Sequence, residues 1–278
     1  MNNKFDVVIV SKDRYDLLFR QIERIKKRIS YNKTIIVDST EKIPNNVHEF
    51  YRGMGIKYYH TPNVKLGYAR QIGLNAVSTP YFFMVDDDIL FKKGIAKKLY
   101  DEIMKYGSDV FAMSPVILFG TNEDILSVYR RKKKDTVGAS SGACLINKCI
   151  VDSIGGFNSK IHRGEDAELF YRAKKRGYRW IRKHNLYVRH SGNEIEFIFR
   201  SWRNREGKLT GIAYGFDSYH GMIIKRIRSI FVHVLGLVKY RNFKATMFFI
   251  CSDVIAIIAF IRGIIGGKEY ALHKKKIV

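Results

Sequence analysis

The chain has 278 residues, enough to bury a large hydrophobic core as one α/β domain or as one domain with a small appendage. Its content of 46% hydrophobic and 27% charged residues is typical of a folded protein and excludes a disordered one. The formal net charge of +24 narrows the partners to polyanions, which are nucleotide diphosphates, nucleic acid and anionic membranes.

The first hundred residues alternate between strand and helix patterns. Short runs of β-branched and aromatic residues predict strands, and apolar residues that recur every three or four positions predict helices. The predicted strands cover residues 5–10, 34–37, 56–59 and 81–85, and the predicted helices lie at residues 17–29, 69–76 and 95–103. Strands that alternate with helices indicate βαβ units, and therefore a mainly parallel sheet covered by helices on both faces.

The pattern changes twice in the remaining chain. The predicted elements after residue 106 are strands at residues 110–118 and 142–146 and a helix that begins near Gly164. After residue 193 acidic residues become sparse, and Lys, Arg and large apolar residues dominate. We therefore predict an α/β domain over residues 1–195, with halves at 1–105 and 106–195, followed by a basic helical region over residues 196–278.

Polar segments directly follow three of the predicted strands. They are Ser11 to Arg14, Asp38 to Thr40 and Asp86 to Asp88. Because the ligands of parallel sheets bind beyond the carboxyl ends of the strands, we expect these segments to converge on one cleft.

The acidic triplet of Asp86, Asp87 and Asp88 needs a counter-charge, because three adjacent carboxylates repel one another. At a strand end such carboxylates can hold a hard divalent cation, which takes oxygen ligands and bridges to phosphate oxygens. Alternate side chains of an extended segment share a face, so we expect Asp86 and Asp88 to point to the same side. The alternative is a solvated turn or a helix start, where acidic residues are also favoured.

A longer pattern resembles the family 2 glycosyltransferases of the GT-A fold. Residues 63–73, NVKLGYARQIG, are similar to an N-x-G-x-x-x-A-R-N-x-G-like stretch that precedes a D-x-D motif in that family. The chain departs from this pattern by one extra residue between Asn63 and Gly67 and by Gln71 in place of the usual Asn. The resemblance runs from Phe5 to about His190. It implies a Rossmann-like, mainly parallel sheet flanked by helices, and inverting transfer of a sugar from a nucleotide-diphosphate sugar.

The same resemblance implies which residues bind the donor and the metal. The nucleotide-sugar-binding candidates are Ser11, Asp13, Arg14, Asp38, Lys65, Arg70, Asp86 and Asp87, and the candidates for binding Mn²⁺ or Mg²⁺ are Asp88, His190 and Asp86. In the family, the first loop and the residue that matches Asp38 contact the base, while the D-x-D motif holds the ribose and the metal. A carboxylate accepts hydrogen bonds from a base or a ribose, and a guanidinium matches a phosphate. Taken alone, Arg70 would be a surface cation and His190 an ordinary histidine.

Gly164-Glu165-Asp166 resembles the family's E-D motif, in which the aspartate is the catalytic base. Asp166 is thus the implied base, and Glu165 is the second catalytic candidate. A nucleotide diphosphate leaves readily once a cation neutralises it, so one base suffices and a single displacement inverts the anomeric carbon. The alternative for both residues is capping of a helix. The Q-x-x-R-W motif of processive synthases is missing around Trp202, so we expect transfer of one sugar.

The C-terminal region predicts basic amphipathic helices. Its apolar face consists of Ile223, Ile227, Ile230, Phe231, Val234, Leu235 and Val238. Residues 243–265 are more apolar but include Lys244, Asp253 and Arg262. We expect these helices to lie on an anionic membrane. A single membrane span, packing against the catalytic domain and a homodimer contact are the alternatives.

The three cysteines lack the spacing of a zinc site or a disulfide framework, which favours a reducing compartment. The first residues are polar and do not resemble a signal peptide. We therefore expect peripheral attachment at the cytoplasmic face of the cell membrane. The expected donor carries UDP, GDP or dTDP, and the expected acceptor is a glycan or a lipid-linked sugar.

Nucleic acid is not an expected partner, because a nucleic-acid-binding protein would leave the acidic triplet unexplained. A nucleotidyltransferase usually has a glycine-rich phosphate loop near its N-terminus, and this sequence has no such loop there. A non-catalytic relative that binds nucleotide-sugar at the membrane would not need Asp86, Asp88 and Asp166 together.

Overall fold

The computed structural model describes residues 5–45, 47–118, 135–138, 141–192, 224, 226–231, 234, 247 and 250–258. The chain divides into two compact units. The first comprises Met1–Leu118 and Lys132–Ser191, and the second comprises Phe119–Arg131 and Gly192–Val278. The predicted domain boundary at residue 195 lies outside the described residues and stays a prediction.

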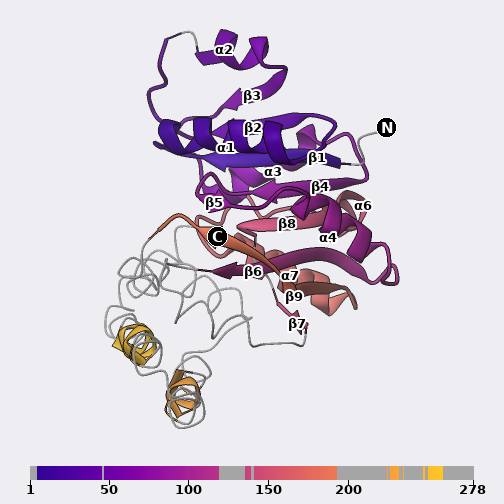
Figure 1. Ribbon diagram of the computed structural model, residues 1–278, viewed down its shortest axis with the longest axis vertical. Helices are drawn as coiled ribbons and strands as arrows, with labels where there is room; N and C mark the ends of the chain where they lie inside the picture. Colours follow the sequence, from indigo (N-terminus) through magenta and orange to yellow (C-terminus); the bar gives the residue numbers. More distant parts are fainter. Residues whose placement is uncertain are drawn as a thin grey trace. The chain divides into compact units, whose positions relative to one another are not determined.

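The first unit is built on one mixed sheet. Its described strands are β1 (Phe5–Ser11), β2 (Thr34–Asp38), β3 (Ile56–His60), β4 (Tyr81–Val85), β5 (Ile89–Leu90), β6 (Val110–Leu118), β7 (Thr136–Val137), β8 (Ala143–Asn147) and β9 (Arg179–His190). Their order is β3-β2-β1-β4-β8-β6-β9-β5, and β7 also pairs with β9 (Figure 1). Strands β1 to β4 are mutually parallel, as are β6 and β9, whereas β8 runs antiparallel to β4 and β6. The predicted mainly parallel sheet is therefore confirmed.

Helices cover both faces of this sheet, as predicted. They are α1 (Tyr15–Arg28), α2 (Val47–Gly53), α3 (Leu66–Ala76), α4 (Ile95–Ile103), α6 (Lys148–Ser153) and α7 (Glu165–Lys175). The buried residues of α1, α2 and α4 join one hydrophobic cluster, and those of α3, α6 and α7 join a second one. The two clusters lie on opposite sides of the sheet because neighbouring residues of a strand point to opposite faces.

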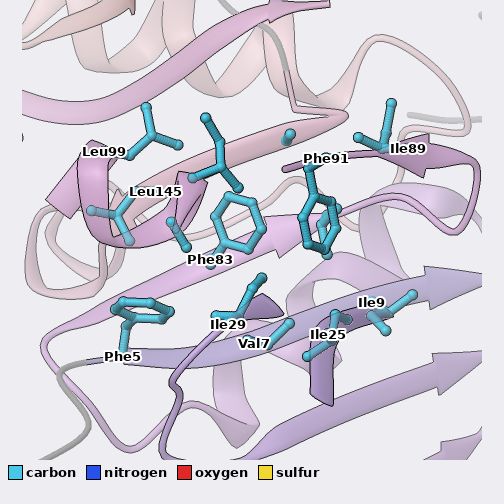
Figure 2. Close-up of a cluster of buried hydrophobic side chains, with 14 of the residues drawn as sticks. Phe5, Val7, Ile9, Ile25, Ile29, Phe83, Ile89, Phe91, Leu99 and Leu145 are labelled. Carbon is cyan, nitrogen blue, oxygen red and sulfur yellow. The ribbon is translucent and has the colours of Figure 1, made fainter. Parts of the chain in front are cut away.

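Strand β1 shows this alternation directly. Val7 and Ile9 belong to the first cluster, together with Ile25 of α1, and Figure 2 shows these side chains on the same side of the strand. Val8 belongs to the second cluster, with Leu74 of α3. Full burial of one such side chain contributes about 1.5–3 kcal/mol to stability. The central strands are apolar on both sides, which explains their continuous hydrophobic runs.

Two glycines of the 63–73 motif are required by close packing of α3. A Cβ atom on Gly67 would lie 2.1 Å from the carbonyl oxygen of Asn158, and one on Gly73 would lie 2.6 Å from Cγ1 of Val8 in β1. The backbone N–H of Gly67 also donates a hydrogen bond to the carbonyl of Ile161 over 3.0 Å. The glycines therefore let α3 approach both the sheet and the loop before α7, which brings Arg70 into the interior.

The second unit contains helical residues between positions 224 and 258. Ile224, Ile227, Phe231 and Val234 are all large, apolar and exposed, and their spacing places them on one side of a helix. Arg226 and the buried Asp253 form an ion pair of 2.7 Å between two helical segments of this unit. Within the described residues, no helix has the length and apolar character needed to cross a membrane. Other residues of the predicted apolar face, such as Ile223, Leu235 and Val238, lie outside the described residues.

Candidate active site

The carboxyl ends of β1 and β4 bring polar side chains into contact, as predicted. Ser11, the last residue of β1, donates a hydrogen bond from Oγ to Oδ2 of Asp87 over 2.6 Å. Arg14, directly before α1, donates from Nη1 to Oδ1 of Asp87 over 3.2 Å and to Oδ2 of Asp88 over 2.8 Å. The first polar loop thus supplies a positive charge to two of the three acidic residues.

The acidic triplet forms a turn, so the expectation of an extended segment is wrong. Residues 87 and 88 are turn residues, and the N–H of Ile89 donates to the carbonyl of Asp86 over 3.3 Å. As a result Asp87 and Asp88 share Arg14 as a partner, while Asp86 faces Arg70, with Oδ1 3.6 Å from Nη2. Gln21 of α1 fixes the turn by donating to the carbonyl of Asp86 over 2.8 Å.

The three carboxylates differ in their electrostatic environment. Burial, with the added repulsion of the neighbouring carboxylates, raises the pKa of Asp86 to about 7 despite the opposing charge of Arg70. Burial also raises the pKa of Asp87. For Asp88, burial acts in the same direction but is outweighed by His190 and Arg14, which hold its pKa below the ordinary value. Asp88 therefore stays ionised most readily, as a metal ligand must.

His190 reaches the triplet through strand pairing. It is the last residue of β9 and lies opposite Ile89 of β5, and its Nε2 is 3.2 Å from Oδ2 of Asp88. Among the residues that the structure describes, no three His, Cys, Asp or Glu side chains form a ready-made metal site. One carboxylate and one imidazole nevertheless suit a cation that takes its remaining ligands from phosphate oxygens and water. Asp88 and His190 therefore fit such a cation, whereas Asp86 faces Arg70.

Arg70 is buried rather than a surface cation. Its side chain is only 4% exposed, and its Nε lies 3.0 Å from Oε1 of Glu165, which is itself 3% exposed. Nη1 donates to the sulfur of Met84 over 3.0 Å. Although burial acts in the opposite direction, Glu165, Asp86 and Asp166 hold the pKa of Arg70 above its ordinary value. Arg70 thus links the acidic triplet of β4 to the start of α7.

The two catalytic candidates occupy different environments. Glu165 is buried against Arg70, and burial raises its pKa. Asp166 is half-buried, and its Oδ2 accepts hydrogen bonds from the Oγ of Ser141 over 3.0 Å and from the N–H of Ser141 over 3.3 Å. Gly164 occupies the N-cap position of α7, with a φ of 87°, and no side chain caps it. Oδ1 of Asp166 accepts the N–H of Ala167 over 2.8 Å, so Asp166 also satisfies a free donor in the first turn of α7. Of the two acids, Asp166 is the one that reaches solvent.

The end of β2 meets the loop after β1. The N–H of Ser39 donates to the carbonyl of Ser11 over 2.9 Å, and the N–H of Asp13 donates to Oγ1 of Thr40 over 2.8 Å. Asp38 is 1% exposed, and Tyr15, Tyr58 and Thr40 donate hydrogen bonds to it. Asp13 and Lys65 are exposed.

Four residues that contact these candidates were not predicted from the sequence: Tyr15, Gln21, Tyr58 and Ser141. Each belongs to a helix, strand or loop distant in sequence from its partner, and no local motif marks them.

Comparisons with known proteins give one family match. The family model described as glycosyl transferase family 2 matches residues 6–162, more than half of the chain. A search of curated proteins found no match.

Two solved structures have a similar fold. One is the mannosyltransferase PcManGT from Pyrobaculum calidifontis in complex with GDP-Man and Mn²⁺, with a TM-score of 0.61 and 12% identity over 92% of this chain and 88% of that one. The other is S. aureus TarS 1-349, with a TM-score of 0.53 and 15% identity over 74% of this chain and 65% of that one. At these identities the likeness concerns the fold.

Proposed function

The chain belongs to glycosyl transferase family 2, and on that premise we propose that it moves one sugar from a nucleotide-diphosphate sugar to an acceptor hydroxyl with inversion at the anomeric carbon. One observation carries the proposal. The acidic triplet, the buried Arg70–Glu165 pair and Asp166 follow one another through ion pairs or electrostatic interactions, which supports a single site for the donor and the acceptor.

The donor side offers charges that suit a nucleotide diphosphate. Arg14 is half-exposed and can exchange its carboxylate partners for phosphate oxygens, because a guanidinium binds both. Asp88 and His190 are the residues that would hold Mn²⁺ or Mg²⁺, and such a cation would neutralise charge on the diphosphate leaving group. The similar fold of a mannosyltransferase in complex with GDP-Man and Mn²⁺ supports this assignment.

The acceptor side offers Asp166 as the general base. Its carboxylate is held by two hydrogen bonds from Ser141, which restrict its rotation. It takes the proton of the acceptor hydroxyl while that oxygen forms the new bond to the anomeric carbon and the bond to the diphosphate breaks. Glu165 holds Arg70 beneath the site and supports the geometry without touching the acceptor.

The acceptor and the location are further parts of the proposal. The exposed apolar residues of the second unit and the net charge of +24 support binding to an anionic membrane at its cytoplasmic face. An acceptor on a lipid-linked sugar would be presented at that surface.

Replacement of the base tests the mechanism. We expect Asp166→Asn to lower nucleotide-diphosphate release from the productive donor by about a hundredfold while donor affinity stays unchanged. The measurement is release of UDP, GDP or dTDP from a panel of sugar donors, with glycan and lipid-linked acceptors supplied separately. Asp152→Asn, at an exposed position of α6, is the matched control and should retain activity. Equal activity of Asp166→Asn and the unaltered chain would exclude Asp166 as the base.

A further inference from the structure

The surface formed by the second half of α1 and the segment after β5 is strongly basic. Residues 20–28 contain five Lys or Arg residues and residues 91–98 contain four, whereas the only acid in these two ranges is Glu23. Glu23 lies 3.3 Å from Lys27, so it balances that one charge. Eight of the nine basic side chains are exposed, and the ninth, Arg24, is half-buried. This part of the first unit therefore carries positive charge that its own acids do not balance.

Direct contacts hold the two parts of this surface together. Arg24 and Arg28 lie in one row of α1, because residues four positions apart in a helix are neighbours. Nη1 of Arg24 lies 3.5 Å from the carbonyl oxygen of Ile89, and Nη1 of Arg28 donates to the carbonyl of Phe91 over 2.7 Å. The N–H of Gly94 donates in turn to the carbonyl of Arg28 over 3.1 Å. Two lysines lie between Phe91 and Gly94, and together with the α1 row they define the basic face: Arg24, Arg28, Lys92 and Lys93.

The charges of the basic face are not balanced by ion pairs. Within the described part of the chain, none of its four side chains forms an ion pair with a carboxylate. Elsewhere in the first unit, Arg172 and Lys183 each have a carboxylate partner. Burial, followed by the like charges of Arg28 and Arg20, lowers the pKa of Arg24. Like charges at this separation repel one another, so an approaching anionic surface stabilises them.

We propose that the basic face docks the first unit against an anionic lipid surface, independently of the second unit. The proposal rests on the proposed function, which places the acceptor at a membrane, and it adds a contact surface to that location. Exposed cations attract anionic headgroups. No large apolar side chain of residues 20–28 or 89–94 is exposed, so the contact is one of charge and not of insertion. For the same reason the basic face offers no exposed aromatic ring on which the bases of a nucleic acid could stack.

The basic face adjoins the acidic triplet. Ile89, next to the guanidinium of Arg24, directly follows Asp88 in the chain. Gln21, in the same part of α1, donates to the carbonyl of Asp86. Docking through the basic face would therefore bring a lipid surface to the edge of the proposed donor site, where an acceptor carried by a lipid is presented to it.

Vesicle binding by two matched lysine pairs tests this proposal. Lys92→Gln/Lys93→Gln removes two charges from the basic face, and Lys174→Gln/Lys175→Gln removes two exposed charges from the end of α7. Co-sedimentation of the full chain with phosphatidylcholine vesicles that contain phosphatidylserine is measured at low and at high salt. The first pair should weaken binding at low salt about tenfold and make its salt dependence less steep, because each cation at the surface adds to the attraction. The second pair should change the affinity by less than about twofold.

Equal losses for the two pairs would show that only the net charge matters, and would overturn the proposal. It would also be overturned if the first pair weakened binding of UDP, GDP and dTDP as much as binding of vesicles, since the basic face would then belong to the donor site. Weaker binding of a single-stranded oligonucleotide by the first pair, with unchanged vesicle binding, would assign the face to nucleic acid instead. An unaltered chain that binds nucleotide but no vesicles would overturn the membrane location and this proposal, and would leave the proposed sugar transfer standing.

Discussion

At the scale of single residues, Arg14 is the side chain that controls the charge of the acidic triplet. It lies within hydrogen-bonding distance of both Asp87 and Asp88, and it is half-exposed, so it can leave without unfolding the site. A bound divalent cation and Arg14 would compete for the same oxygen, Oδ2 of Asp88. Under the proposed function, a bound cation would release Arg14 from Asp88, and the guanidinium could then contact the diphosphate.

This competition predicts that Arg14→Gln binds Mn²⁺ more tightly than the unaltered chain when no nucleotide is present. The expected gain is up to about fivefold, because half-exposed ion pairs contribute little. Titration followed by the electron paramagnetic resonance of free Mn²⁺ measures it. Arg20→Gln, on the exposed side of α1, is the control and should leave the affinity unchanged. Weaker Mn²⁺ binding by Arg14→Gln would show that Arg14 does not compete.

Residue roles were harder to predict than residue positions. The motif around Arg70 predicts a residue that binds the nucleotide-sugar, which stays a prediction. The burial of Arg70 was not predicted, because it depends on Glu165, which lies 95 positions later in the chain. Likewise two of the hydrogen bonds that Asp38 accepts come from tyrosines of α1 and β3. Such partners come together by tertiary packing, which no local pattern specifies.

At the scale of elements, the most periodic segments were predicted best. The strands Tyr81–Val85 and Val110–Leu118 and the helix Ile95–Ile103 have the predicted bounds. The short helices α2 and α6 were not predicted, because six or seven residues show too little periodicity. Strand β9 was missed because charged residues interrupt it, and its buried Lys183 is compensated by Glu102 and Asp135 from elsewhere in the chain.

The Arg70–Glu165 pair joins α3 to α7 and should stabilise that contact. Glu165→Leu would leave the guanidinium of Arg70 without its closest partner in the interior, and we expect a loss of about 3 kcal/mol in the free energy of unfolding. The double variant Arg70→Met/Glu165→Leu should recover most of it, because no unpaired charge remains. Unfolding in urea measures both.

The exposed Lys97–Asp101 ion pair on α4 is the control for this stability measurement. Asp101→Asn should change the free energy of unfolding by less than about 1 kcal/mol, since water screens an exposed pair. A double variant as unstable as Glu165→Leu would show that the pair does more than neutralise buried charge.

At the scale of the whole molecule, the net charge of +24 and the exposed apolar residues of the second unit are the features that the catalytic proposal does not use. Phe231 is 65% exposed, the highest value among the exposed large hydrophobic residues of the described chain. An apolar face beside many cations is the combination that binds anionic lipid surfaces.

We predict that the chain co-sediments with vesicles containing phosphatidylserine, less so at high salt, and that Phe231→Ser weakens this binding several-fold. Salt acts because it screens the attraction between basic residues and anionic lipid. Phe50→Ser is the matched control, since Phe50 is 44% exposed but belongs to the first unit. If both variants lose the same share of vesicle binding, exposed apolar residues in general, and not those of the second unit, support the binding.

The central claim is metal-assisted binding of a nucleotide-diphosphate sugar, and calorimetric titration tests it most directly. UDP, GDP and dTDP are each titrated with and without Mn²⁺ into the unaltered chain and into Asp88→Ala. We predict that one nucleotide binds tightly, and that the binding needs both Mn²⁺ and Asp88. Binding of no nucleotide under any condition, or equal binding by Asp88→Ala, would contradict it.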